Sequence, residues 1–273
     1  MNEKIWFITG ASRGLGRVWA EAALARGDKV AACVRNKSAL LDLSERYGST
    51  LLPIELDVRN EEDVKQAVRV AASHFGGLDV VVSNAGYAVF GMIEETDQKN
   101  AREQFDTNFF GTLWVIQAAL PYLRKQGRGH ILITSSLAGI ITFPTAGVYN
   151  ATKWAVEGLG ETLASEVAEF GIKVTLIEPG GYDTDWRGSS STNLTPMAEY
   201  VGLRERLKAA SVSRKPGDPA ATAEAILKVV DTPSPPLRLF LGEVPLVVAR
   251  KQYAERLATW EAWADVSRRA QGL

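Results

Sequence analysis

The chain has 273 residues, of which 46% are hydrophobic and 23% are charged, and its formal net charge is −1. This balance is typical of a globular protein with a sizeable core, and it provides no general basic field for nucleic acid or an anionic membrane. No apolar stretch approaches the roughly 20 residues that a membrane span requires, so we expect neither nucleic acid nor membrane as a partner.

The first residues and the cysteine usage indicate a compartment. Met1 to Lys4 lead directly into an apolar run, which leaves no room for a signal peptide. Cys33 is the only cysteine, so no disulfide can form within the chain. Both features suit a reducing compartment, and we therefore expect a cytoplasmic protein.

Short apolar runs alternate with stretches of helical periodicity along most of the chain. We predict strands at Ile5–Thr9, Val30–Val34, Leu51–Leu56, Leu78–Ser83, His130–Thr134, Lys173–Ile177 and Leu237–Leu241. We predict helices at Gly14–Arg26, Lys37–Tyr47, Glu61–His74, Lys99–Arg124, Val148–Phe170 and Pro219–Val230. Continuous rather than alternating apolar strands indicate a parallel sheet covered on both faces. We therefore predict an α/β fold, with residues 1–273 forming a single doubly wound, Rossmann-type domain.

A glycine-rich turn with the pattern T-G-x-x-x-G-x-G follows the first predicted strand and opens the first predicted helix. A tight turn needs one glycine, whereas this one has three. Glycines let the backbone approach a pyrophosphate, and a helix N-terminus offers it unpaired N–H groups and positive potential. The turn is therefore a candidate dinucleotide-binding loop, formed by Gly10, Ser12, Arg13, Gly14, Leu15 and Gly16.

The end of the second predicted strand bears on the choice of dinucleotide. A chain that selects NAD usually has an acidic residue there, which binds the ribose 2′-hydroxyl. No carboxylate occurs between Asp28 and Asp42, and Arg35 follows the strand. Arg13 in the glycine loop is a second cation, and two arginines would bind a 2′-phosphate through charge-assisted hydrogen bonds. We predict NADP(H) as the cofactor, with NAD(H) as the alternative.

Further polar or glycine-containing motifs follow the later strands. They are Asp57 and Val58 after the third, Asn84, Ala85 and Gly86 after the fourth, Ser136 after the fifth, and Pro179 to Thr184 after the sixth. In a parallel sheet the carboxyl ends of all strands lie at one edge, so these residues are expected to line one crevice.

Tyr149 and Lys153 lie four residues apart in the fifth predicted helix and therefore share one face. A phenol beside an ammonium is a proton donor or acceptor, and the cation should lower the tyrosine pKa from its usual value of about 10. Ser136 stands thirteen residues before the tyrosine. A serine at a strand end is ordinarily a cap, but this register favours a role beside Tyr149.

Together, these motifs resemble the short-chain dehydrogenase/reductase family, in its shorter form with T-G-x-x-x-G-x-G and Y-x-x-x-K. One departure is Ser83, where the family more often has a second asparagine before Asn-Ala-Gly. The resemblance implies a seven-stranded parallel sheet with helices on both faces and strand order 3-2-1-4-5-6-7. It also implies a homo-oligomer, either a dimer or a tetramer, formed through the helices that hold Asn108 and Tyr149.

The resemblance assigns roles to the motif residues. Tyr149 would be the general acid or base, Ser136 would bind the carbonyl oxygen, and Asn108 would hold a water that links Lys153 to solvent. Cofactor contacts would come from the glycine loop and Arg35, from Asp57, Val58, Asn84, Ala85 and Gly86, and from Tyr149, Lys153, Pro179, Gly180 and Thr184. Asp57 could also cap the helix that begins at Glu61.

The implied activity is hydride transfer between a nicotinamide and a small-molecule carbonyl compound or secondary alcohol. 

His74 and His130 are far apart in the sequence and lack metal-ligand spacing, so we expect no metal site. The favoured prediction is a ketone or aldehyde reductase. The alternatives are an NAD-dependent alcohol dehydrogenase of the same family and, in a different class, a non-catalytic NADP(H)-binding sensor or scaffold.

The C-terminal third of the chain is expected to set specificity. Residues 185–219 mix small polar residues with an amphipathic stretch, which is typical of a mobile lid over a substrate. Phe90, Phe143 and Trp186 are candidate pocket residues that favour an apolar or aromatic carbonyl compound.

Residues 243–273 form a predicted helical extension that packs either on the chain's own core or on another subunit. Its apolar residues recur at helical spacing: Leu246, Tyr253, Leu257, Trp260 and Ala264.

Overall fold

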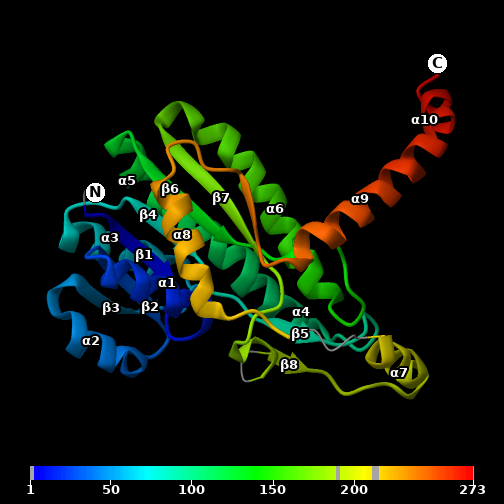
Figure 1. Cartoon of the computed structure of the whole chain (residues 1–273), viewed down its shortest axis with the longest axis horizontal. Helices are drawn as coiled ribbons and strands as arrows, with labels where there is room; N and C mark the ends of the chain where they lie inside the picture. Colours follow the sequence, from blue (N-terminus) through cyan, green and yellow to red (C-terminus); the bar gives the residue numbers. More distant parts are fainter. Residues whose placement is uncertain (1–2, 189–190, 211–214, 273) are drawn as a thin grey trace.

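Seven parallel strands form the central sheet, in the order β3-β2-β1-β4-β6-β7-β9 (Figure 1). The computed structural model describes residues 3–188, 191–210 and 215–272. The strands of this sheet are β1 Ile5–Thr9, β2 Lys29–Val34, β3 Leu51–Glu55, β4 Val80–Ser83, β6 Gly129–Thr134, β7 Ile172–Pro179 and β9 Arg238–Leu241. The fold class and the strand order predicted from the sequence are confirmed.

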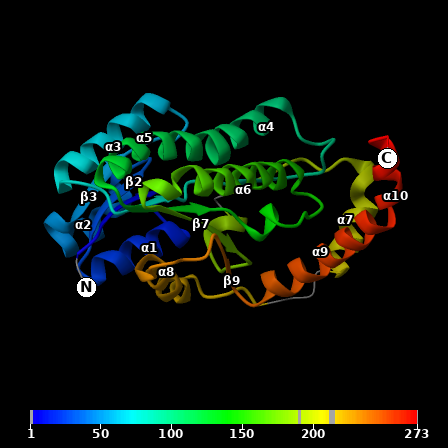
Figure 2. The same ribbon diagram turned by 90° about the horizontal axis from the view of Figure 1, so that it is seen from above.

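Helices cover both faces of this sheet (Figure 2). On one face lie α1 and α8, and on the other lie α3, α5 and α6. The helices are α1 Gly14–Ala25, α2 Leu41–Tyr47, α3 Glu61–Phe75, α4 Gln98–Phe105, α5 Gly111–Gln126, α6 Gly147–Val167, α7 Val201–Ala210, α8 Thr222–Asp231, α9 Val244–Ala262 and α10 Ala264–Ala270.

Alternation along each strand explains why both faces are apolar. In β1, Trp6 and Ile8 point into the core beneath α1 and α8, whereas Phe7 points into the core beneath α3 and α5. All three side chains are fully buried. A strand that is covered on both sides needs an apolar residue at every position, which produces the continuous apolar runs seen in the sequence.

The long helix expected over residues 99–124 is interrupted. A π-helical turn at Asp106–Phe110 separates α4 from α5. Such a turn inserts an extra residue into the helical hydrogen-bonding pattern and often marks a functional position. It contains Asn108, so the interruption falls at one of the candidate site residues.

A second, two-stranded parallel sheet was not predicted. It pairs β5 (Ala88–Phe90) with β8 (Ser191–Asn193). Each strand has only three residues, too few for a periodic signal, and about a hundred residues separate the two in sequence. The pairing attaches part of the expected lid to the segment that follows β4.

The C-terminal extension is helical, as predicted, and projects from the body of the molecule (Figure 1). Only its first turns cover the chain's own core, where Ala249 packs against Leu137 and Ile141. Farther along, Leu257 is 50% exposed and Trp260 is 62% exposed. Packing on the chain's own core is therefore the wrong alternative for the distal part of this helix.

No helix in the described parts of the chain is both long enough and apolar enough to cross a membrane.

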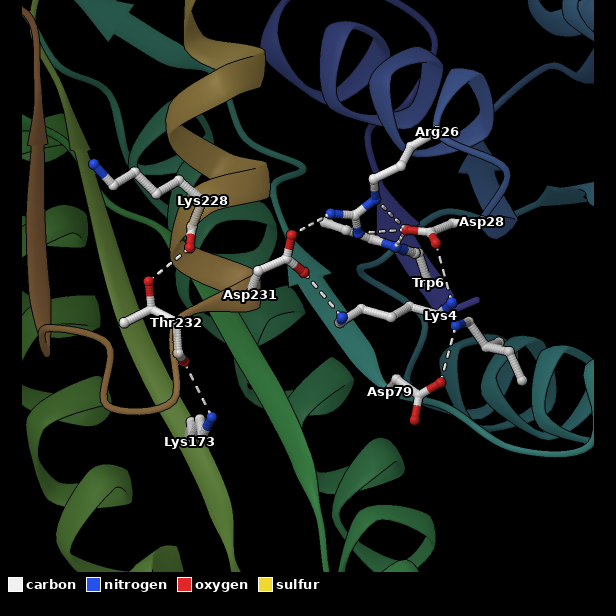
Figure 3. Close-up of polar contacts among 10 residues, drawn as sticks. Lys4, Trp6, Arg26, Asp28, Asp79, Lys173, Lys228, Asp231 and Thr232 are labelled. Carbon is white, nitrogen blue, oxygen red and sulfur yellow. Dashed lines mark hydrogen bonds and ion pairs between the residues drawn. The ribbon is translucent and has the colours of Figure 1, made fainter. Parts of the chain in front are cut away.

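One buried carboxylate, that of Asp28, ties the amino ends of the first two strands together (Figure 3). It accepts hydrogen bonds from the Lys4 amide at 3.0 Å and from the Trp6 indole at 2.8 Å. The Arg26 guanidinium binds the same carboxylate, with Nη2 at 2.5 Å. Asp231 of α8 joins the network through Lys4 and Arg26, so one cluster joins β1, β2, α1 and α8.

We expect Asp28→Ala to lower the free energy of unfolding by about 3 kcal/mol, because it leaves a buried indole N–H and a guanidinium without their acceptor. Asp231→Ala is the matched control, because this partly exposed carboxylate contributes at most about 1 kcal/mol. Urea unfolding of both variants measures the difference. Equal losses of unfolding free energy would show that Asp28 contributes no more to stability than Asp231.

Candidate active site

The glycine loop brings backbone close to backbone at the carboxyl end of β1. Gly10 has a φ of +66°, and a Cβ placed there would lie 2.9 Å from the Cα of Ala85. A Cβ at Gly16 would lie 2.5 Å from the Gly10 carbonyl oxygen. Side chains are therefore excluded at Gly10 and Gly16, so backbone packs on backbone where β1 leads into the first turn of α1. Such a cradle fits the phosphates of a dinucleotide.

The loop is held in place by Thr9 and Asn84. The fully buried Thr9 hydroxyl accepts hydrogen bonds from the amides of Asn84 at 3.0 Å and Ala85 at 3.1 Å. The Asn84 side-chain amide donates to the carbonyls of Thr9 at 3.1 Å and Gly10 at 3.2 Å. The ends of β1 and β4 are thereby locked together directly beneath the glycine loop.

Tyr149 and Ser136 meet at the start of α6, as their register predicts. Tyr149 is 7% exposed, and the Ser136 side chain lies near enough to its hydroxyl to favour the phenolate. Ser136 also accepts from the Ala138 amide at 3.1 Å and so caps the short turn Leu137–Gly139. The neighbouring Ser135 is buried, and its hydroxyl has no hydrogen-bond partner among the described residues.

Lys153 lies one helical turn beyond Tyr149 and points back toward the sheet. Its Nζ donates to the Thr134 carbonyl at 2.7 Å, at the end of β6, and lies 5.8 Å from the centroid of the Tyr149 ring. A Cβ at Gly86 would lie 3.8 Å from the same Nζ. The lysine therefore sits between β6 and the segment after β4.

Asn108 is anchored to both sides of the crevice. Its side-chain oxygen accepts from the Tyr87 amide at 3.0 Å, and its Nδ2 donates to the Tyr87 carbonyl at 2.9 Å. The same Nδ2 lies 3.1 Å from the hydroxyl of Thr152, the neighbour of Lys153. The π-helical turn thus links the segment after β4 to α6.

Burial determines the protonation behaviour of Tyr149 and Lys153. It raises the pKa of Tyr149, and the nearby Ser136 side chain opposes this rise only in part. Burial also lowers the pKa of Lys153 to about 8, against the opposing charge of Glu157. The expected lowering of the Tyr149 pKa is therefore wrong for this structure. Desolvation of the phenolate dominates, because the Lys153 ammonium is bound to the Thr134 carbonyl over the ring face.

The two predicted phosphate-binding arginines flank the glycine loop and the end of β2. Arg13 immediately precedes α1, and Arg35 is exposed directly after β2. The Asp57 carboxyl has a lowered pKa, first because Arg59 donates hydrogen bonds to it, with the charge of Arg35 adding to the effect. Arg35 and Asp57 thus lie near one another, at the ends of neighbouring strands.

The alternative role of Asp57 as a helix cap is wrong. Asn60 caps α3, accepting from the amides of Glu62 at 3.1 Å and Asp63 at 3.3 Å. Asp57 is instead bound by the Arg59 guanidinium, with Nη2 at 2.6 Å.

The remaining cofactor candidates lie around the same crevice. Val58 is buried, and a Cβ at Gly14 would lie 3.8 Å from Thr184. Pro179 ends β7, and the Gly180 amide donates to the Leu241 carbonyl at 2.9 Å. A surface cavity of about 360 Å³ lies between α1 and the segment around Thr184.

Two of the three candidate pocket residues lie against Tyr149. Trp186 has its ring centroid 5.4 Å from that of Tyr149, and Phe90 packs on the same small cluster. Phe143 is 41% exposed, and its carbonyl accepts from Asn150 at 2.9 Å. The structure therefore joins Phe90 and Trp186 to the catalytic candidates but leaves the Phe143 ring at the surface.

The expected lid is anchored through the side chain of Glu95, which is fully buried. Its carboxylate accepts from the Met197 amide at 2.8 Å and pairs with Arg204 of α7. Burial opposes ionisation of Glu95, but these hydrogen bonds lower its pKa. Residues 189–190 and 211–214 of the expected lid lie outside the described residues.

Sequence reasoning missed the residues that hold the site residues in place. Tyr87 and Thr152 fix Asn108, and Thr9 fixes the glycine loop. Thr152 lies inside the Tyr149–Lys153 run, which was the one signal available for it. The described residues contain no group of three or more His, Cys, Asp or Glu side chains that could hold a metal ion.

Comparisons with known proteins give consistent results. The family model for short chain dehydrogenases matches residues 4–195. Oxidoreductase BOA17 from Botryotinia fuckeliana is 43% identical over 269 residues, which covers 97% of this chain and 98% of the relative. A crystal structure of a short-chain dehydrogenase from Streptomyces avermitilis is 37% identical with a TM-score of 0.90, covering 98% of each chain.

Two further solved structures contain nicotinamide nucleotides. An alcohol dehydrogenase from Thermococcus sibiricus, complexed with 5-hydroxy-NADP, is 28% identical with a TM-score of 0.74, covering 89% of this chain and 98% of its own. A short chain dehydrogenase/reductase from Burkholderia phymatum, in complex with NAD, is 25% identical with a TM-score of 0.79, covering 94% and 95%.

We expect Thr9→Val to lower the free energy of unfolding by about 3 kcal/mol, because the two buried amides of Asn84 and Ala85 lose their acceptor. Thr9→Ser keeps the hydroxyl and removes one methyl group, which costs only about 1 kcal/mol. Urea unfolding of the two variants makes the comparison, and a valine variant as stable as the serine variant would contradict this account.

Proposed function

Because the chain belongs to the short chain dehydrogenase family, we propose that it is an NADP(H)-dependent oxidoreductase acting on a carbonyl compound or secondary alcohol. Of the two directions, carbonyl reduction by a ketone or aldehyde reductase is the one that we favour. One observation carries the proposal: the buried Tyr149 phenol lies beside Ser136, with the Lys153 ammonium 5.8 Å from the centroid of the Tyr149 ring. A protein that only binds dinucleotide has no physical need of this arrangement, which argues against the sensor or scaffold alternative.

The glycine loop and Arg35 fit an NADP-type cofactor. When bound, reduced nicotinamide supplies the hydride that reduces a carbonyl carbon. The loop between β1 and α1 would hold the pyrophosphate at a helix N-terminus. Because the solved relatives contain both nucleotides, the preference for NADP(H) rests on Arg13, on Arg35 and on the absence of an acidic residue after β2.

Tyr149 acts as the general acid. Its raised pKa keeps the phenol protonated at neutral pH, so Tyr149 Oη can donate a proton to the oxygen on which negative charge develops. Ser136 Oγ donates a second hydrogen bond to that oxygen and fixes its orientation. The Lys153 ammonium stabilises the phenolate left behind, and Asn108 holds the water through which the proton is replaced.

The side chains around Tyr149 favour an apolar or aromatic substrate. Phe90 and Trp186 line one side of the phenol, and residues 185–219 would close over the substrate while anchored to Glu95.

Phe110 and Trp154 are each 39% exposed on the helices that carry Asn108 and Tyr149. These two aromatic residues suit a homo-oligomer contact along α5 and α6.

We expect Tyr149→Phe to reduce NADPH-dependent turnover of a carbonyl substrate by about 10²- to 10⁴-fold, because the general acid is lost. Cofactor affinity should change little, since the ring remains in place. Following NADPH absorbance against a panel of ketones and aldehydes measures turnover, and fluorescence titration measures binding. Unchanged turnover in the variant would refute the role of Tyr149, whereas tight NADPH binding without turnover in the wild type would favour the sensor.

We expect Arg35→Asp to lower the preference for NADPH over NADH by about tenfold to a hundredfold, because a charge-assisted contact to the 2′-phosphate becomes repulsive. Arg46→Asp makes the same change of charge on the exposed surface of α2 and should leave the preference unaltered. The ratio of kcat/KM for the two cofactors is the readout, and equal effects of the two variants would rule out a specific role for Arg35.

A further inference from the structure

Two buried carboxyl groups meet one helical turn beyond Lys153. Glu157 of α6 is 5% exposed, and Glu178 of β7 is fully buried. Among the described residues, Glu157 Oε1 and both oxygens of Glu178 lack a conventional hydrogen-bond partner. Two carboxylates cannot hydrogen-bond to each other, but a carboxylic acid and a carboxylate can. Both carboxyl groups lie against the same Arg238 Nε, so one proton held between them would give a partner to Glu157 Oε1 and to one Glu178 oxygen.

Arg238 of β9 supplies the only cation that contacts this pair within the described residues. Its Nε lies 2.9 Å from Glu157 Oε2 and 3.6 Å from Glu178 Oε1. Its Nη2 lies 2.7 Å from Glu161, which is exposed on the same helix. One guanidinium cannot neutralise the two buried carboxylates together with the exposed carboxylate of Glu161. Burial raises the pKa of Glu178 to about 8, with the charge of Glu157 adding to the effect and Arg238 opposing it.

The pair is enclosed together with the backbone of Lys153. A Cβ at Gly139 would lie 2.7 Å from Ser135 Oγ, 2.9 Å from Glu157 Cγ and 3.0 Å from the Lys153 carbonyl oxygen. The turn that follows the catalytic serine thus packs on α6 with no room for a methyl group. In so tight an enclosure a charge on Glu157 is weakly screened, and it acts on the Lys153 ammonium with corresponding strength.

We propose that Glu157 and Glu178 share one proton, and that this pair is a positioning device that keeps the buried Lys153 ammonium charged. The proposal rests on the proposed function in so far as Lys153 supports Tyr149. With the proton on Glu178, Glu157 is a carboxylate that opposes the desolvation of Lys153. Glu157 therefore acts on the reaction through Lys153 and does not touch the substrate.

The charged and titratable groups around the pair come from three elements. Tyr149, Lys153 and Glu161 share α6 with Glu157, and Arg238 approaches from β9. Arg256 of α9 lies 4.9 Å from the Trp154 ring on the outer side of α6. Of these groups, Glu157 is the one whose charge raises the pKa of Lys153 against burial. Removing that charge should lower the pKa of Lys153 further.

The test is the pH dependence of NADPH-dependent carbonyl reduction in three variants. In Glu157→Gln, the alkaline limb of kcat should move to lower pH by about one unit, because the ammonium is lost earlier. Glu161→Gln is the matched control, since it removes a carboxylate from the same helix and the same arginine, and its limb should not move. Glu178→Gln reproduces the protonated acid and should follow the wild type below pH 8. Equal profiles for the Glu157 and Glu161 variants would overturn the proposal.

A second measurement does not depend on turnover. The folded-state pKa of Glu178 lies above that of the unfolded chain, so its contribution to stability is lost as the pH rises toward 8. Unfolding by urea at pH 5 and pH 8 should show the wild type losing stability relative to Glu178→Gln. A constant difference between the two proteins would refute the shared proton. If the wild type reduces no carbonyl compound but passes this test, the proposed function fails while the shared proton stands.

Discussion

The hydrogen bonds at the end of β1 are the constraint on which the rest of the site depends. A parallel sheet brings the carboxyl ends of its strands to one edge, but it does not by itself fix the segments that leave them. Thr9 does so, because its hydroxyl accepts from both amides after β4 while Asn84 returns to the carbonyls of Thr9 and Gly10. This lock lies between β1 and β4, where the strand order reverses, and ligands bind at such points in open α/β sheets.

Burial, rather than pairwise charge, sets the protonation of the candidate catalytic residues Tyr149 and Lys153. The same desolvation raises the pKa of Tyr149 and lowers that of Lys153, so each group is pushed toward its neutral form. A protonated phenol suits a general acid, whereas an ammonium that deprotonates near neutral pH does not support one. The carboxylate of Glu157, one turn farther along α6, counters the second effect. A single helix face thus carries both the reacting group and its electrostatic support.

The elements around the crevice differ in how firmly they are attached. The turn Leu137–Gly139 is packed so closely against α6 that Gly139 has no space for a side chain. The region around α7 is held mainly by polar contacts to Glu94 and Glu95, such as the 2.6 Å hydrogen bond from Tyr200. Polar contacts near the surface separate more readily than packed apolar faces. The firm turn therefore positions Ser136, whereas the contacts around α7 are of the kind that separates more readily.

Local sequence was enough to predict the sheet, the strand order implied by the family motifs, and the clustering of Asn108, Ser136, Tyr149 and Lys153. These follow from local periodicity and from motifs whose spacing is fixed within one strand, turn or helix. Four other features could be found only in the folded chain: the pairing of β5 with β8, the π-helical turn, the cap at Asn60 and the direction of the Tyr149 pKa shift. The meeting of Glu157 with Glu178 and Arg238 was likewise invisible, because it joins three elements distant in the chain. Burial and long-range contact depend on where all elements come together, and no local pattern records that.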